Sequence, residues 1–140
     1  MLGGYDQENY PIKPVYTCSL NALLQSCNPQ SVGANLTRSR SPSEVWRRVT
    51  DIPATDSAYV PFCDRLLAIG GGESTYKLTT AVHMYNPSTN SWEVISHMGT
   101  PRRKCYAAVL PDNQLTVVGG QTDSSLDSET GTVEIATIPK

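Results

Sequence analysis

The chain has 140 residues and a formal net charge of -2, the size of a single domain with no basic surplus. This balance argues against nucleic acid and anionic membranes as partners, because both attract proteins with a positive field. No apolar stretch reaches the roughly 18 residues that a membrane helix needs, and the N-terminal MLGGYDQENY lacks the features of a secretory signal. We therefore expect a cytoplasmic protein whose cysteines, none of them in a C-x-x-C pair, remain thiols: Cys18, Cys27, Cys63 and Cys105.

The predicted elements are short strands separated by turns rich in Pro, Gly, Asn, Asp and Ser. A single short helical pattern occurs at residues 19–25. Strands are expected at Ala58–Phe62, Arg65–Ile69, Ala81–Tyr85, Trp92–Ile95, Tyr106–Leu110, Leu115–Val118 and Thr132–Ala136. Tight turns are expected at residues 86–92 and 111–114, because Asn, Pro and Ser favour turn geometry. This pattern predicts an all-β fold.

The chain repeats a strand that ends in two glycines. Residues 58–71 (AYVPFCDRLLAIGG) align without a gap with residues 107–120 (AAVLPDNQLTVVGG), and a third diglycine stands at residues 3–4. Val82 and Val15 each follow a diglycine at the same spacing, and Trp46 is the counterpart of Trp92 once the first copy is allowed a long insertion. That insertion falls at about residues 22–44, where Ser, Asn, Pro and Arg gather, and it predicts an exposed loop.

A period of about 50 residues with an apolar strand, a diglycine, Val-x-x-Tyr and a spaced Trp resembles the kelch repeat. The middle copy carries this pattern at Leu66–Gly71, Val82, Tyr85 and Trp92. In the outer copies Cys18 and Ala136 stand where Tyr85 stands in the middle one, and the third copy has no Trp. The resemblance implies kelch-type β-propeller blades, each a four-stranded antiparallel meander of strands a to d, in which Tyr85 and Trp92 pack between blades.

Counted as blades, the chain divides into three parts. Residues 1–52 are the end of a first kelch blade with the long loop at about 22–44, residues 53–97 are a complete blade, and residues 98–140 are a partial blade with strands a to c. A closed ring of four to eight such repeats needs roughly 200 to 400 residues. We therefore expect an incomplete ring: a fragment of a longer protein, or a chain that closes a ring with partner chains.

The sequence offers no catalytic, cofactor or metal site. The glycines in LLAIGGGE (residues 66–73) precede no helical pattern and no Gly-Lys-Ser/Thr, so they are interpreted as strand ends and not as a phosphate loop. His83 and His97 have no carboxylate or thiol at metal-binding spacing. The prediction is a non-catalytic chain. The alternative is part of a kelch-propeller enzyme, of the oxidase or lyase type, whose catalytic residues lie outside this chain.

A binding surface remains. The resemblance implies that the b–c and d–a loops emerge on one face, and here these loops are residues 72–78, 96–104 and 121–128. Arg and Tyr are favoured at interface hot spots, and Arg can bind one carboxylate through two parallel hydrogen bonds. We expect an interaction module of a scaffold or adaptor that binds a protein or an acidic peptide, although the arginines could instead pair with Glu73 or Asp123. The candidate partner-binding residues are Glu73, Ser74, Thr75, Tyr76, Lys77, Arg102, Arg103 and Lys104.

Overall fold

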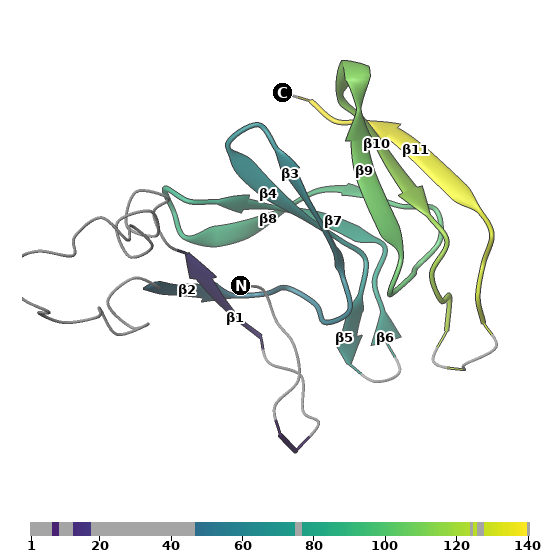
Figure 1. Cartoon of the computed structure of the whole chain (residues 1–140), viewed down its shortest axis with the longest axis horizontal. Coiled ribbons are helices and arrows are strands. Elements are labelled where there is room, and N and C mark those ends of the chain that lie inside the picture. Colours follow the sequence, from purple (N-terminus) through teal and green to yellow (C-terminus); the bar gives the residue numbers. More distant parts are fainter. Residues whose placement is uncertain are drawn as a thin grey trace, which may run out of the picture.

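The computed structural model describes residues 7–8, 13–17, 47–74, 77–123, 125 and 128–139. Within these ranges the fold is all-β, as predicted, with one short 3-10 turn and no helix that could span a membrane. Figure 1 shows the strands as separate twisted sheets that do not close into a ring. The strands are β1 Pro14–Thr17, β2 Arg47–Asp51, β3 Ala58–Phe62, β4 Arg65–Ile69, β5 Gly72–Ser74, β6 Lys77–Leu78, β7 Ala81–Asn86, β8 Ser91–His97, β9 Tyr106–Leu110, β10 Gln114–Val118 and β11 Val133–Thr137.

The largest sheet is the four-stranded antiparallel meander expected of a complete kelch blade. Its order is β3-β4-β7-β8, and each strand pairs with the next along the chain. All four strands were predicted from the sequence, and β8 is longer than predicted at both ends. Tyr85 and Trp92 are cross-strand partners whose ring centroids lie 5.3 Å apart, a spacing at which aromatic rings attract. Tyr85 also donates a hydrogen bond to Asn90 in the turn that joins these two strands.

The second sheet has three strands in the order β11-β10-β9. Its β9–β10 turn contains Pro111–Asn113, with Asp112 and Asn113 at positive φ, whereas the β3–β4 turn contains only Cys63 and Asp64. The gap-free alignment of the two copies is therefore wrong by one residue in the first strand. Tyr106, and not Ala107, is the counterpart of Ala58, because each pairs with the last residue of the following strand.

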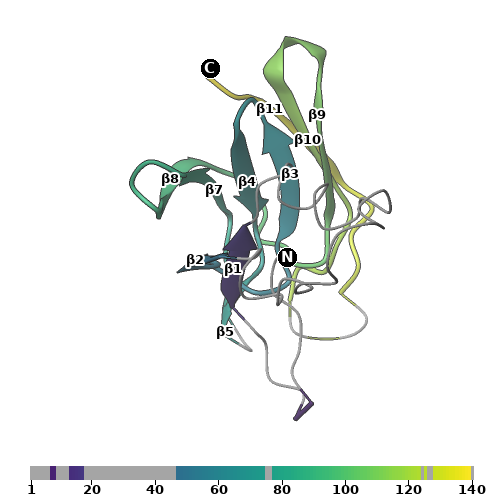
Figure 2. The ribbon, with the colours of Figure 1, turned by 60° about the vertical axis from the view of Figure 1, so that its left-hand side comes forward.

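The apolar core lies between these two sheets. One face of the first sheet contributes alternate residues of each strand, and the facing side of the second sheet contributes Leu115 and Val117. Because neighbours in a strand point to opposite faces, the buried set follows directly from the alternation. Figure 2 shows the second sheet packed beside the first. The buried cluster is Val60, Phe62, Leu67, Ile69, Val82, Cys105, Leu115, Val117 and Ile138.

Two small two-stranded sheets complete the described strands. β1 pairs with β2, and Val15 of β1 is buried. β5 pairs with β6 inside the predicted loop at residues 72–78, so this connection is a short hairpin and not an open loop. Several sequence-based predictions lie outside the described residues: the helical pattern at 19–25, the long loop at 22–44, the first diglycine and Trp46.

The glycines after β4 end the strand for steric reasons, as predicted. Gly71 has φ 102°, and its N–H donates a 2.8 Å hydrogen bond to the carbonyl of Arg102. A Cβ at this position would lie 2.4 Å from the carbonyl oxygen of Thr55. Only glycine fits where the backbones approach so closely.

Candidate partner-binding site

The β5–β6 hairpin holds the first group of predicted binding residues. Glu73, Ser74 and Lys77 are exposed, and the Lys77 ammonium forms an ion pair with the Glu73 carboxylate. The hydrogen bond and charge of Lys77 lower the pKa of Glu73. The hairpin therefore presents a carboxylate and an ammonium that already satisfy each other. Thr75 and Tyr76 lie outside the described residues.

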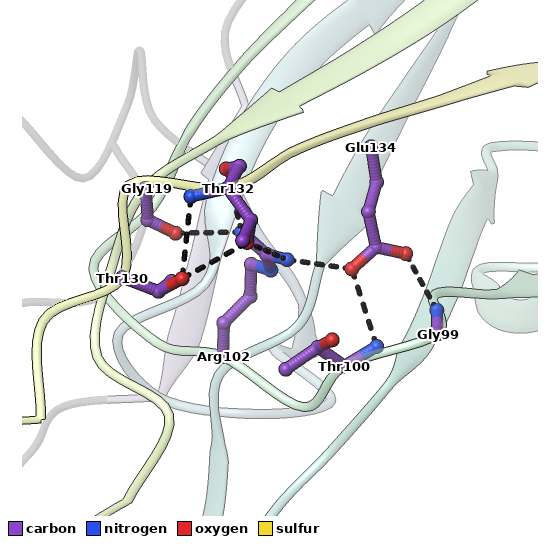
Figure 3. A network of polar contacts seen from close by, with 7 residues as sticks. All are labelled: Gly99, Thr100, Arg102, Gly119, Thr130, Thr132 and Glu134. Atoms are coloured by element: carbon purple, nitrogen blue, oxygen red, sulfur yellow. Dashed lines mark hydrogen bonds and ion pairs between the residues drawn. The ribbon is translucent and has the colours of Figure 1, made fainter.

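Arg102 does not lie on the surface, and its predicted role as a partner-binding residue does not fit its position. None of its side chain is exposed, and the guanidinium points into the second sheet. It donates to the carbonyl of Gly119 at 2.9 Å, to Thr132 Oγ1 at 3.1 Å and to Glu134 Oε1 at 2.5 Å (Figure 3). Because Arg stays charged at all ordinary pH values, this burial requires the compensating acceptors. Arg102 is a structural residue that joins the linker before β9 to the start of β11.

Glu134 is the other half of this contact, and the sequence analysis did not single it out. Its Oε2 accepts a 2.6 Å hydrogen bond from the Gly99 N–H, and its Oε1 accepts one from Thr100 N–H at 3.2 Å (Figure 3). Burial by itself raises the pKa of Glu134, but the hydrogen bonds from Gly99 and Arg102 outweigh that effect and lower it. Two charged residues 32 positions apart, in a linker and a strand, carry no sequence signal that they meet.

Arg103 and Lys104 follow Arg102 but have different surroundings. Arg103 is half-buried, and its Nε donates a 3.2 Å hydrogen bond to Gln121 Oε1, while the two backbones form an isolated β-bridge. Lys104 is exposed, has φ 52°, and donates its N–H to the carbonyl of Asp56. Among the described residues no ion pair involves Lys104.

The second b–c connection resembles the first. Gln121 bridges Glu129, and the Thr122 N–H donates to the carbonyl of Ser128. The Asp123 carboxylate accepts a 2.6 Å hydrogen bond from the Ser125 N–H. Hydrogen bonds from Ser125 and Ser128 lower the pKa of Asp123, and the charge of Arg103 contributes in the same direction.

These groups lie at one end of the molecule. Figures 1 and 2 show the β5–β6 hairpin and the β10–β11 connection projecting at the same end, opposite to the β3–β4 and β9–β10 turns. The structure brings Arg103 to Gln121, and it pairs Glu73 with Lys77 within its own hairpin. The predicted binding residues that are described and are exposed or half-buried are called the hairpin surface: Glu73, Ser74, Lys77, Arg103 and Lys104.

A second surface feature was not anticipated as a site. The face of the β9–β11 sheet that points away from the core is apolar and exposed, with 79% of Tyr106 and 61% of Ile135 accessible, and also Leu110, Val118 and Val133. We call this the outer face. The outer face corresponds to the face of the first sheet that the second sheet covers. The two faces are equivalent because Val118 pairs with Tyr106 in the second sheet as Ile69 pairs with Ala58 in the first. The outer face therefore has the character of a blade face that packs on another blade.

Neither histidine belongs to a metal cluster within the described ranges, where no group of three potential ligands occurs. His83 is half-buried in β7, and burial lowers the pKa of its imidazole, although the Glu73 carboxylate opposes that change. Its Nδ1 is buried without a hydrogen-bond partner.

Comparison with known proteins agrees with this geometry. The Kelch motif family matches residues 53–99, which include all of β3 to β8. The human influenza virus NS1A-binding protein is 42% identical over 67 residues, which are 48% of this chain and 10% of that protein. Beta-scruin of Limulus polyphemus is 32% identical over 87 residues, which are 61% of this chain and 9% of that protein. The chain thus matches about a tenth of the length of each relative. We conclude that residues 53–99 of this chain form a kelch motif.

Proposed function

We propose that the chain is a non-catalytic protein-interaction module that works within a larger scaffold or adaptor in the cytoplasm. The hairpin surface contacts a protein or peptide partner, and neither nucleic acid nor a membrane is its ligand. The observation that carries the proposal is that the β5–β6 hairpin, the β10–β11 connection and the β8–β9 linker lie at one end of the pair of sheets. Loops that a rigid scaffold positions are the usual place for binding residues. The name of the human NS1A-binding relative supports a protein as ligand.

An acidic segment is the partner that Lys104 favours. Lys104 is exposed and forms no ion pair with any described residue, and Arg103 lies beside it. Lys77 contributes less, because Glu73 already neutralises it. Thr75 and Tyr76 stay in the proposal on the sequence argument alone. Arg102 leaves it, because a fully buried guanidinium cannot reach a partner.

The test compares two charge reversals in the whole chain. Lys104→Glu alters the hairpin surface, whereas Arg65→Glu reverses an exposed charge at the start of β4, beside the turn at the opposite end. Binding of fluorescent peptides rich in Asp and Glu is followed by anisotropy at low and high salt. We expect Lys104→Glu to weaken binding about tenfold at low salt and Arg65→Glu to leave it unchanged. Equal effects of the two reversals, or none from either, would count against the hairpin surface.

A further inference from the structure

The contact between Arg103 and Gln121 has a counterpart at the first sheet. Thr55 forms an isolated β-bridge with Gly72, as Arg103 does with Gln121. In both bridges each residue donates its N–H to the carbonyl of the other, over distances of 2.7 to 3.0 Å. The two bridges are therefore equivalent, and each one holds the backbone of the segment that leads into the first strand of its sheet.

The two bridges differ in their side chains. Gly72 has none, and the Thr55 hydroxyl donates back to the Gly72 carbonyl at 3.2 Å. Gln121 is only 9% exposed, and its Oε1 accepts the 3.2 Å hydrogen bond from Arg103 Nε. Because the Nε–H of an arginine can only donate, the amide must present its oxygen, and not its nitrogen, to the guanidinium. The second bridge therefore orients the side chain of Arg103 in addition to its backbone.

The orientation of the guanidinium decides how it can bind a carboxylate. A guanidinium makes two parallel hydrogen bonds either from its side, with Nε and one Nη, or from its end, with both Nη atoms. The amide of Gln121 engages Nε, so a carboxylate would be bound end-on. A carboxylate suits these surroundings: hydrogen bonds from Ser125 lower the pKa of Asp123, and the charge of Arg103 acts in the same direction.

We propose that Gln121 is a positioning residue, which orients the Arg103 guanidinium for an end-on contact with a carboxylate of the acidic partner. This inference rests on the proposed function of the hairpin surface and adds a specificity determinant to it. Lys104 attracts any acidic group, whereas an oriented guanidinium matches the plane of a carboxylate and binds it through two hydrogen bonds. Gln121 does not need to touch the partner, because it acts through Arg103.

The experiment is a double-mutant cycle on the whole chain, with Arg103→Lys, Gln121→Leu and the two changes together. Binding of a fluorescent peptide rich in Glu is followed by anisotropy at one ionic strength. Arg103→Lys keeps the charge but removes the Nε–H, and Gln121→Leu removes the acceptor but keeps a side chain of similar size. We expect each single change to weaken binding about fivefold, and Gln121→Leu to have almost no effect once Arg103→Lys is in place.

A control variant and a second measurement accompany the cycle. Gln114→Leu makes the same chemical change at an exposed residue at the start of β10, beside the turn at the opposite end, and should leave binding unchanged. Gln121→Asn, whose side chain is one methylene shorter, replaces Gln121→Leu if circular dichroism shows that the latter has not folded. NMR of the Arg103 Nε–H needs no peptide, and its exchange with water should be about tenfold faster in Gln121→Leu than in the wild type.

Three results would overturn the inference. The first is the same loss of affinity from Gln121→Leu with and without Arg103→Lys, which would make Gln121 a merely structural residue. The second is weaker binding by Arg103→Lys but not by Gln121→Leu, and the third is equally fast exchange of the Nε–H in both chains. If neither Lys104→Glu nor Arg103→Lys weakens binding, the proposed function fails and the inference fails with it. If Lys104→Glu weakens binding but the cycle shows no coupling, only the inference fails.

Discussion

Arg102 and Glu134 form the most deeply buried ion pair of the described residues. The other two pairs have both side chains largely exposed and contribute little to stability. Here the guanidinium is fully buried and removed from water, whereas the carboxylate is 28% exposed. Acceptors on Gly119 and Thr132 and donors on Gly99 and Thr100 replace that water. A pair of this kind contributes little net stability by forming, but the loss of one partner is costly.

Replacement of Arg102 by Ala should therefore destabilise the fold strongly. Glu134 would keep its two backbone donors but lose its counter-ion, and the Gly119 carbonyl would lose a donor. We expect a loss of about 3 kcal/mol in the free energy of unfolding, measured by urea denaturation. Lys104→Ala is the control, and it should change stability by less than about 0.5 kcal/mol because its side chain is exposed. Similar small effects for both variants would mean that the buried pair is not important for stability.

The lowered pKa of Glu134 predicts how this contribution depends on pH. A carboxylate whose pKa is lower in the folded than in the unfolded chain stabilises the fold fully above its unfolded value, about 4.3 for Glu. That stabilisation disappears as the pH falls through the lowered folded value. The difference in unfolding free energy between the wild type and Glu134→Gln should thus be largest near pH 7 and shrink below about pH 4. A wild-type to Glu134→Gln difference that is constant with pH would contradict the assignment.

At the scale of elements, strands were easier to predict than the contacts between them. Alternation of apolar and polar residues and turn-forming residues located β3, β4 and β7 to β11, because both signals act over a few neighbouring residues. The one-residue error between the copies arose at the turn with Pro111. A slip of one residue moves every side chain of a strand to the opposite face. Ala107 packs on the core from the second sheet, whereas Tyr106, the true counterpart of Ala58, lies on the opposite face of that sheet.

The candidate site was less predictable for a related reason. Charge and loop position correctly indicated an exposed Lys104, but the same criteria also selected Arg102, which is buried. Only the Arg102 side chain meets Thr132, just before β11, and Glu134 within β11, and this contact depends on how the sheets fold. Local sequence holds no information on such a long-range pair.

The diglycine after β4 gives a prediction at the scale of an element. Gly71→Ala would place a methyl group 2.4 Å from the Thr55 carbonyl oxygen and 2.5 Å from Ser57 Oγ, at a φ of 102° that an L-residue rarely adopts. We expect a loss of at least about 2 kcal/mol in unfolding free energy. The strain of the backbone at Gly71 adds to the cost of displacing the segment at Thr55 and Ser57 that leads into β3. Gly131→Ala is the matched control, because a Cβ there meets no atom within 4 Å. Thermal unfolding of both variants measures the contrast, and equal midpoints would show that the close approach at Gly71 is relaxed.

At the scale of the whole molecule, the two larger sheets are stacked face to face. The second sheet covers the face of the first that holds Leu67 and Ile69. Its own equivalent face, with Tyr106 and Ile135, is exposed. Repeat units of this type obtain much of their stability from contacts between neighbours. In the isolated chain the outer face is therefore a large apolar surface without its counterpart, and such surfaces drive association.

This exposure predicts that a charge on the outer face improves the behaviour of the isolated chain in solution. Ile135→Lys puts an ammonium at the centre of the β11 part of that face, where the side chain is already 61% accessible, so little burial is lost. We expect the concentration at which light scattering detects aggregates to rise several-fold, with unfolding free energy within about 1 kcal/mol of the wild type. Thr89→Lys, in the exposed β7–β8 turn, adds the same charge elsewhere and should have a much smaller effect. If Thr89→Lys improves solubility equally, net charge and not the outer face governs association. If the wild-type chain is monodisperse at high concentration, the exposed face does not require a covering blade.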